Sequence, residues 1–353
     1  MIDTSFKTRI APTPSGFLHL GNGAAFVATW VLARVNAGKI MLRIDDLDAE
    51  RMRPEYVEDI FKTLDWLGLD WDEGPFSVED FSQNWSQHLR LDFYEKALSD
   101  LQKTGDLYVC NCSRKDIKLR SKNGLYPNTC RENRLLNDEQ TSARLETAPT
   151  LMPNTAWRIV VEDNKSVHFN NFEKIGLLSI NGILREKEDI LSNFEQQTSA
   201  RFQTSPTLTS PTLTAINLSQ TMGDFIVRQK NGFPSYQLAS LVDDTLHNIN
   251  FVVRGEDLLN STAAQIFLAE RLNKADFSMT NFWHHPLITD ADGAKLSKSE
   301  GAASLLDVKR RNDSAAIVVK QAATWLGFTD FDGKTALELV DFIKCSATLR
   351  SRK

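Results

Sequence analysis

The stretch "RIAPTPSGFLHLGNG" (residues 9–23) decides the fold. It joins the end of a short apolar strand, "TRIA" (8–11), to a loop that holds two prolines and a glycine, "PTPSG" (12–16). An apolar helix is predicted to follow, from about Gly23 to Asn36. The positive end of such a helix faces the ligand side of the sheet, where a phosphate suits it. A strand, a loop and a helix in this order open a nucleotide-binding fold.

Residues at the start of that helix are candidates for contact with a nucleotide. Gly21 and Gly23 would let a ligand approach the backbone, because neither carries a side chain. His19 could donate a hydrogen bond to a phosphate oxygen while charge grows during attack on an α-phosphorus. A lone histidine is usually structural, so this interpretation depends on the rest of the chain.

The segments that follow alternate between strands and helices. We expect a buried strand at 39–44, a helix at 54–68 and a long amphipathic helix at about 84–104. This alternation implies a parallel sheet. Further along the chain, 157–161 and 166–170 are predicted to be strands that pair with each other.

A Thr/Ser-rich segment interrupts the pattern at about 173–217. The sequence "TSPTL" is repeated there and prolines break every periodicity, so we expect a mobile surface insertion. The alternating sheet is predicted to resume afterwards, with strands at 223–228 and 250–255 and helices at 235–245 and 261–272. The remaining tail is expected to hold two or three short helices.

Together these elements predict an α/β protein built on a Rossmann-like doubly wound parallel sheet, with an α+β insertion and a short C-terminal helical segment. We expect the first half of the Rossmann-like domain at 1–105 and the insertion at 106–216. The second half, with a lysine-containing loop, is expected at 217–300, and a helical tail at 301–353.

The bulk composition is that of an ordinary globular protein. The chain has 353 residues, of which 41% are hydrophobic and 25% are charged. No apolar run is long enough to cross a membrane, and the first residues lack the apolar stretch of a signal peptide, so we expect a cytoplasmic protein. A net charge of −5 argues against nonspecific coating of nucleic acid but leaves room for a local basic groove.

Three of the four cysteines lie close together, at Cys110, Cys112 and Cys130. This spacing is more typical of a metal site in a reducing compartment than of a disulfide framework, and Cys345 stands alone. A tetrahedral zinc site needs a fourth ligand, and no fourth cysteine is near. The alternative is a small core that contains three reduced cysteines.

The stretch "DADGAKLSKSEG" (290–301) is a loop presented by the turn Asp292-Gly293. Lys295 and Lys298 could place two ammonium groups near a polyanion, and the small residues between and after them leave backbone N–H groups accessible. Taken alone, a solvated charged loop is the more common interpretation. With His19 at a helix start, however, the lysines form a specific combination that suits a nucleotide triphosphate.

These two segments carry a resemblance to a known family. The chain resembles class I aminoacyl-tRNA synthetases, with "HLGN" in place of the HIGH-type signature and "KLSKS" in place of the KMSKS-type loop. Within that class, "RIAPTPSGFLHLG", "LRIDDLD" and "VVRGEDLL" resemble the glutamyl branch, and "CNCSRKDI" with "GLYPNTCRE" resembles the glutamyl-queuosine tRNA(Asp) synthetases, which lack an anticodon-binding domain. The resemblance covers about 1–172 and 217–310.

The resemblance implies a set of site residues. For catalysis it implies His19, Lys295 and Lys298, with Lys298 stabilising the pentacoordinate transition state. For ATP it implies His19, Gly21, Asn22, Lys295, Ser297, Lys298 and Ser299. For glutamate it implies Arg9, Ile10, Ala11, Pro12, Thr13, Asp45, Tyr236 and Arg254. For structural zinc it implies Cys110, Cys112, Tyr126 and Cys130, with His168 as an alternative fourth ligand.

The amino-acid pocket departs from the family pattern at two positions. Asp45 stands where the family usually has Glu, which shortens the carboxylate arm by one methylene, and Ser240 stands where Asn is frequent. As isolated residues, Arg9 and Arg254 would be ordinary strand-end arginines and Asp45 a surface acid. An acidic substrate nevertheless needs guanidinium partners, because an unpaired buried charge is costly.

The predicted function is a two-step ligase. ATP with Mg²⁺ activates glutamate to glutamyl-adenylate, and the glutamyl group then passes to queuosine in the anticodon loop of tRNA(Asp). Two alternatives remain: a truncated glutamyl-tRNA synthetase that charges the tRNA 3′ end, and a noncatalytic RNA-binding paralogue. We expect a monomer with no membrane partner.

Overall fold

The computed structural model describes residues 6–48, 50–121, 123–133, 154–172, 175, 211–288, 304–311 and 314–350. In chain order its main helices and strands are β1 (Lys7–Ile10), α1 (Leu20–Val35), β2 (Lys39–Leu42), α2 (Pro54–Trp66), α3 (Val78–Asp80), α4 (Leu91–Lys103), β3 (Leu107–Cys110), α5 (Arg114–Arg120), β4 (Ala156–Ile159), β5 (Ser166–Phe172), β6 (Thr212–Asn217), α9 (Leu218–Thr221), β7 (Phe225–Arg228), α10 (Tyr236–Leu246), β8 (Phe251–Gly255), α11 (Leu259–Arg271), α12 (Ala275–Ser278), β9 (Asn281–His285), α13 (Leu305–Arg310), α14 (Ala316–Trp325) and α15 (Ala336–Arg350).

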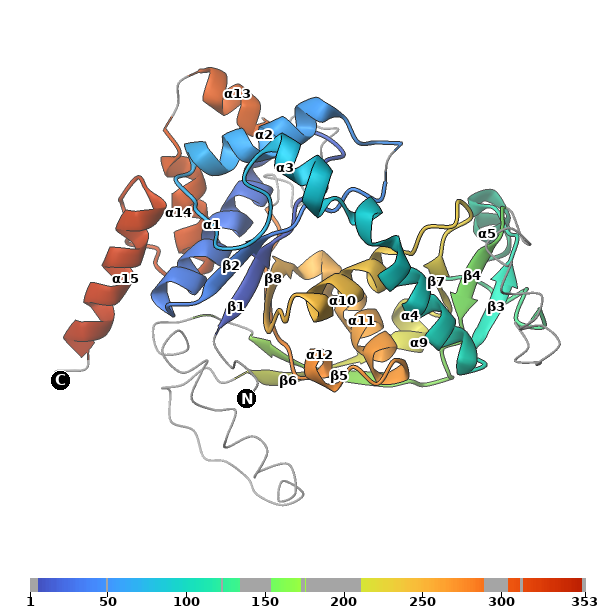
Figure 1. Cartoon of the computed structure of the whole chain (residues 1–353). Coiled ribbons are helices and arrows are strands. Elements are labelled where there is room, and N and C mark those ends of the chain that lie inside the picture. Colours follow the sequence, from blue (N-terminus) through green and yellow to red (C-terminus); the bar gives the residue numbers. More distant parts are fainter. Residues whose placement is uncertain are drawn as a thin grey trace, which may run out of the picture.

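Parallel strands form the centre of the molecule. β1 pairs with β2, and β9 pairs with both β8 and β5, in each case in parallel. β1 also lies beside β8, because the Asn250 N–H donates to Lys7 O at 3.1 Å and Asn250 Oδ1 accepts from Lys7 N at 2.9 Å (Figure 1). The predicted parallel α/β core is therefore confirmed for β1, β2 and β8, and β9 is a further parallel strand that the sequence analysis did not predict.

Helices cover this centre on two sides. One apolar core gathers α1, α2 and β1 with α14 and α15, which lie beside α1 in Figure 1. A second core gathers α10 and α11 with β5, β8 and β9. α1 is almost completely buried along its length because apolar residues occupy its whole surface, as in "AAFVATWVLA". The C-terminal helices are thus part of the main core rather than an appendage.

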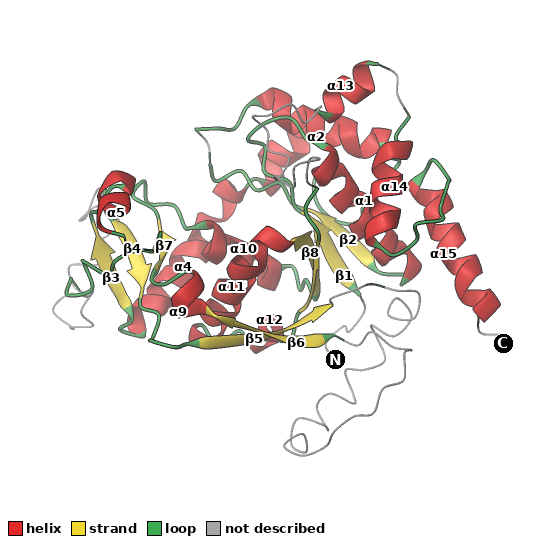
Figure 2. Ribbon diagram, turned by 180° about the vertical axis from the view of Figure 1, so that it is seen from behind, coloured by secondary structure: helices red, strands yellow, loops and turns green. Residues whose placement is uncertain are grey.

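The strand 223–228 does not belong to the parallel sheet. It is β7, and it forms a three-stranded antiparallel sheet in the order β3–β4–β7, at one end of the molecule in Figure 2. The predicted pairing of 157–161 with 166–170 is also wrong, because β4 lies in this sheet whereas β5 pairs with β6 and β9. The alternation of apolar residues predicts that a strand exists but does not say which strand it pairs with.

Two further boundaries differ from prediction. Residues 212–217, which we assigned to the mobile insertion, form β6 and pair antiparallel with β5, while 176–210 lie outside the described residues. The long helix expected at 84–104 is interrupted at Ser86, whose extended ψ of 140° separates a π-turn from the helix that becomes α4. Ser86 leaves the helix because its hydroxyl donates to Asp46 Oδ2 at 2.5 Å and accepts from the His88 N–H.

Among the described helices, none is both long enough and apolar enough to span a bilayer.

Candidate functional site

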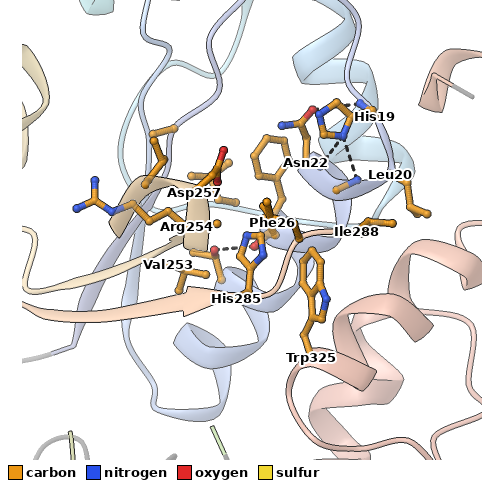
Figure 3. Close-up of a pocket in the computed structure, with 18 of the residues that line it drawn as sticks. His19, Leu20, Asn22, Phe26, Val253, Arg254, Asp257, His285, Ile288 and Trp325 are labelled. Atoms are coloured by element: carbon orange, nitrogen blue, oxygen red, sulfur yellow. Dashed lines mark hydrogen bonds between the residues drawn. The ribbon is translucent and has the colours of Figure 1, made fainter. Parts of the chain in front are cut away.

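A pocket of about 270 Å³ opens at the carboxyl ends of β1 and β8, beside the first turn of α1 (Figure 3). This volume is near the lower end of the range for small-molecule sites. Of the residues predicted to bind ATP or glutamate, the pocket brings together Arg9, Ile10, Ala11, His19, Gly21, Asn22, Tyr236 and Arg254. Pro12, Thr13 and Asp45 were predicted here as well, but they do not line it.

His19 caps α1 at the edge of this pocket. Its Nδ1 accepts hydrogen bonds from the N–H groups of Gly21 (3.1 Å) and Asn22 (3.3 Å), and Asn22 Oδ1 accepts from the His19 N–H. Because Nδ1 is an acceptor in both bonds, the neutral ring carries its proton on Nε2. The N–H groups of Gly21 and Asn22, which we expected to face a ligand, are therefore bonded to His19, whose imidazole proton lies on Nε2.

The two glycines near His19 have different roles. A Cβ at Gly23 would lie 2.8 Å from Leu305 Cδ1 and 3.0 Å from Val318 Cγ1. Gly23 therefore permits the close packing of α13 and α14 on α1, and the prediction that it serves ligand approach is wrong. Gly21 does line the pocket, although a Cβ there would lie 3.1 Å from His19 Cε1.

Two arginines form the wall of the pocket opposite His19. Arg9 donates from Nε to Asp244 Oδ1 at 3.3 Å and from Nη1 to Val253 O at 3.2 Å. Arg254 donates from Nη2 to Thr262 Oγ1, while its Nε and Nη1 are buried and have no hydrogen-bond partner among the described residues. Burial lowers the pKa of Arg254 to about 10, an effect to which the charge on Arg9 adds and which Tyr236 opposes.

Asp45 is committed to a different arginine. Its carboxylate accepts two hydrogen bonds from Arg43, at 2.6 Å to Oδ1 and 3.0 Å to Oδ2. Arg43 also donates to Asp244 at 2.6 Å and to Ser240 Oγ at 3.2 Å. Arg43 thus shares Asp244 with Arg9 of the pocket wall, and the two positions that depart from the family pattern, Asp45 and Ser240, are joined through one guanidinium.

The sequence analysis missed several residues that line the pocket. The imidazole of His285, at the end of β9, stacks on the indole of Trp325 from α14, with ring centroids 4.1 Å apart. Asp257 supplies a carboxylate and Phe26 an apolar face (Figure 3). The pair of histidines in "NFWHHPL", which follows three apolar or polar strand residues and precedes Pro286, was an available signal for His285. Nothing in the sequence indicated that a residue of the tail reaches the site.

The lysine loop lies outside the described residues, and with it Lys295, Ser297, Lys298 and Ser299. The described residues on both sides of it do reach the pocket. Ile288 lines the pocket, and Ser304 forms a β-bridge with His19, next to the hydrogen bond from Leu305 N to Leu18 O at 2.8 Å. After the lysine loop, Lys309 of α13 forms an ion pair with Asp59 of α2, with Nζ 2.6 Å from Oδ1.

The three clustered cysteines come together in the antiparallel end of the molecule. The Sγ atoms of Cys110, Cys112 and Cys130 lie within 4.8 Å of one another, and those of Cys112 and Cys130 are 3.6 Å apart. The Tyr126 hydroxyl is 3.5 Å from Cys110 Sγ and 4.0 Å from Cys112 Sγ. Sulfur ligands of a tetrahedral zinc, each about 2.3 Å from the metal, lie about 3.8 Å apart, so this donor set fits zinc.

His168 is not a candidate for the fourth ligand. It lies on β5, where it is exposed and opposite Ala215 of β6, in a different sheet from the cysteines. Among the described residues, one group of cysteine, histidine and carboxylate side chains is close enough to share a metal ion, and it consists of the three cysteines. Burial raises the pKa of the Tyr126 hydroxyl, and its bonds to the cysteines add to the shift, which a bound cation would reverse.

Comparison with known proteins gives a consistent result. A family model described as "tRNA synthetases class I (E and Q), catalytic domain" matches residues 5–153 and 184–353. A glutamyl-Q tRNA(Asp) synthetase of Symbiobacterium thermophilum is 34% identical over 91% of this chain and 87% of its own length. A glutamate–tRNA ligase of Thermosynechococcus vestitus is 31% identical over 95% of this chain, which spans only 60% of that ligase.

Solved structures agree on the fold. The crystal structure of a glutamate tRNA ligase from Elizabethkingia meningosepticum, in complex with its amino acid, superposes with a TM-score of 0.59 at 22% identity. The superposition covers 88% of this chain and 54% of that ligase. At this level of identity the likeness concerns the arrangement of helices and strands alone.

Proposed function

The chain belongs to the class I tRNA synthetases of the glutamyl and glutaminyl type, and on this premise we propose that it activates glutamate with ATP and transfers it to queuosine in tRNA(Asp). In the first step a glutamate carboxylate oxygen attacks the α-phosphorus of ATP, and the bond to the β-phosphate oxygen breaks to release pyrophosphate. In the second step a hydroxyl of queuosine attacks the acyl carbon, AMP leaves and an ester forms.

One observation carries the choice of an acidic substrate. Arg254 is a buried guanidinium, 5% exposed, that forms no ion pair with any described carboxylate. A buried charge without a counterion is costly, so a site with this feature favours an anionic ligand. Arg9 contributes a second guanidinium to the same wall. Arg9 already pairs with Asp244, so the negative charge of a dicarboxylic amino acid is the counterion that Arg254 lacks.

The His19 side of the pocket suits the phosphates of ATP, which would enter as its Mg²⁺ complex. The Nε2–H of His19 supplies a hydrogen-bond donor next to the positive end of α1. We assign Lys295 and Lys298 to the same phosphates. Lys295 follows Ile288 by seven residues and Lys298 precedes Ser304 by six, so each lies within about 25 Å of chain from a residue at the pocket.

We assign the cysteine cluster to structural zinc, held by Cys110, Cys112, Cys130 and Tyr126. Bound zinc would tie β3 to the 123–133 segment and so stabilise the antiparallel end of the molecule. Zinc analysis of the purified protein tests this assignment, with Cys130→Ser as the variant and Cys345→Ser as the matched control. We expect zinc at one equivalent in the control and a loss of zinc in Cys130→Ser; equal, metal-free stability of both proteins would refute the site.

Pyrophosphate exchange tests the first step. The protein is incubated with ATP, labelled pyrophosphate and glutamate, with aspartate and glutamine as comparison substrates. We expect exchange with glutamate and little with glutamine, whose side chain lacks the charge that Arg254 requires. Binding of tRNA without exchange on any amino acid would favour the noncatalytic RNA-binding paralogue instead.

The acceptor needs a separate test, because the 31% identity to a glutamate–tRNA ligase supports charging of the 3′ end as a second candidate. Labelled glutamate is offered with tRNA from cells that make queuosine and from cells that do not, each with and without the 3′-terminal adenosine. We expect labelling that requires queuosine and survives removal of the adenosine. Labelling that requires the adenosine and ignores queuosine would show the ligase activity.

A further inference from the structure

Behind Arg254, a row of polar side chains leads away from the pocket into the sheet. The Arg254 guanidinium is 2.5 Å from Thr262 Oγ1, which is 2.7 Å from Nε2 of His284, whose Nδ1 is 2.8 Å from Asn171 Oδ1. The four residues come from β8, α11, β9 and β5. All of them are buried, and each is at most 8% exposed.

The chemistry of the two ends sets the direction of every bond. Arg254 can only donate, so Thr262 Oγ1 accepts from it. Asn171 Oδ1 can only accept, so His284 carries its proton on Nδ1 and leaves Nε2 as an acceptor. The Thr262 hydroxyl therefore donates to His284 Nε2 at 2.7 Å, in preference to Leu258 O at 3.2 Å. Donors and acceptors then alternate without conflict from Arg254 to Asn171.

The surroundings keep His284 neutral. The ring stacks on Phe282, with centroids 6.1 Å apart, and Phe169 lies 6.0 Å away. Burial, together with the charges of Arg254, His285 and Arg9, lowers the pKa of His284 to about 2. A neutral imidazole in one tautomer is what the row of hydrogen bonds requires.

We propose that Thr262 and His284 are positioning residues that hold the Arg254 guanidinium by Nη2 and so direct Nη1 at a carboxylate oxygen of the bound amino acid, while Nε, on the other edge of the guanidinium, stays available for a second acceptor. The inference rests on the proposed function for the identity of that ligand. Without the Thr262 oxygen, Nη2 of Arg254 loses its buried acceptor, and the guanidinium keeps its contacts with Tyr236 and with the face of Phe282, 5.1 Å from its Cζ. A planar donor must keep its orientation to direct its N–H groups at a carboxylate oxygen.

The test compares Thr262→Val, which removes the acceptor with little change of shape, with Thr262→Ser, which keeps it. Pyrophosphate exchange gives KM values for glutamate and for ATP. In Thr262→Val we expect the KM for glutamate to rise about tenfold or more, as for loss of a hydrogen bond to a charged group, and the KM for ATP to stay within about twofold. Thr262→Ser should remain close to the wild type in both values.

A second variant tests whether the two residues act as one unit. His284→Phe removes the Nε2 acceptor and keeps an aromatic ring between Phe282 and Phe169. We expect it to raise the KM for glutamate to a similar extent, and the double variant to cost little more than either single change, because both break one row of bonds. Variants that lose thermal stability while the KM for glutamate stays unchanged would reduce the row to a structural role and overturn the proposal.

Nitrogen-15 NMR of the wild type gives a readout that does not depend on catalysis. We expect His284 as the Nδ1–H tautomer, and a restrained Arg254 Nε–H signal that is kept in Thr262→Ser and broadened in Thr262→Val. An Nε2–H tautomer, or an Arg254 signal that Thr262→Val leaves unchanged, would overturn the proposal. If the wild type activates no amino acid, the proposed function fails, while these signals still decide whether Thr262 and His284 position Arg254.

Discussion

Arg43 and Arg254 are buried to nearly the same degree, at 2% and 5% exposure, yet their surroundings are opposite. Arg43 contacts the carboxylates of Asp45 and Asp244 and lies 3.9 Å from Asp243. Arg254 contacts a hydroxyl and an aromatic face. Burial lowers the pKa of both, but the three aspartates raise that of Arg43 well above its usual value, whereas that of Arg254 falls to about 10. A buried arginine that is paired with carboxylates belongs to the framework of the fold, and one without a counterion is available to a ligand.

The largest effect on stability is expected from replacing Arg43, the arginine that is paired with carboxylates. Arg43→Met leaves Asp45 and Asp244 buried with less compensation, which should lower the free energy of unfolding by about 3–5 kcal/mol. Urea unfolding measures the change. Lys62→Met is the matched control, because its ion pair with Glu58 is exposed on a helix surface, at 70% and 51%, and should be worth under about 1 kcal/mol. Equal stability of the two variants would contradict the comparison.

Replacing Arg254, which has no counterion, should affect activity rather than stability. Arg254→Met removes a charge that has no counterion, so the free energy of unfolding should stay unchanged or rise, while kcat/KM for glutamate should fall about 10²–10³-fold. Arg254→Lys keeps the charge but not the planar pair of donors and should recover only part of the activity. If Arg254→Met unfolds like Arg43→Met and activates glutamate normally, Arg254 belongs to the framework.

The pH dependence of folding stability tests the surroundings of Arg254, because His284 lies behind it. In the folded protein the pKa of this side chain is about 2, whereas the unfolded chain takes up a proton near the ordinary value of 6.5. The unfolded state therefore binds the extra proton below pH 6.5, and folded stability falls as the pH drops towards 2. At pH 5 the loss should be about 2 kcal/mol. Unfolding at pH 7 and pH 5 measures it, and His284→Phe should reduce the pH dependence by that amount; an unreduced dependence would assign the loss to other groups.

A smaller loss of stability than that of Arg43→Met is expected at the opposite wall of the pocket, where the contacts are local in sequence. His19→Ala removes the cap of α1 and should cost about 1 kcal/mol of unfolding free energy. His19→Asn can still accept from the helix N–H groups and should cost a few tenths, about 0.3 kcal/mol. Both lack the Nε2–H, so both should slow pyrophosphate exchange to a similar extent. Normal exchange in His19→Asn would remove the imidazole from the phosphate site.

Local contacts explain why the His19 side was predictable. The cap joins residues at most three apart, and the strand, loop and helix that present it are continuous in "RIAPTPSGFLHLGNG". The same holds for Cys110 and Cys112, which share one strand end with a third cysteine nearby. The role of Asp45 in glutamate binding stays a prediction, and the sequence did not indicate that its carboxylate is bonded to Arg43, two residues away.

Other features depended on which strands become neighbours. The strand at 223–228 was recognised but assigned to the wrong sheet, since an alternating pattern is satisfied by any partner with an apolar face. The role assigned to Gly23 was wrong for a related reason: the contact that requires it, with Leu305 and Val318, joins α1 to helices almost 300 residues later.

The sequence by itself determined β1, β2 and β8 of the parallel core, the helix start that His19 caps and the family to which the chain belongs, because each depends on residues close together in the chain. Only the tertiary structure decided which arginine has counterions and which does not. Arg43 and Arg254 each follow apolar strand residues and look alike in the sequence. Their difference arises where α10 brings Asp243 and Asp244 to one of them, and α11 brings a threonine to the other.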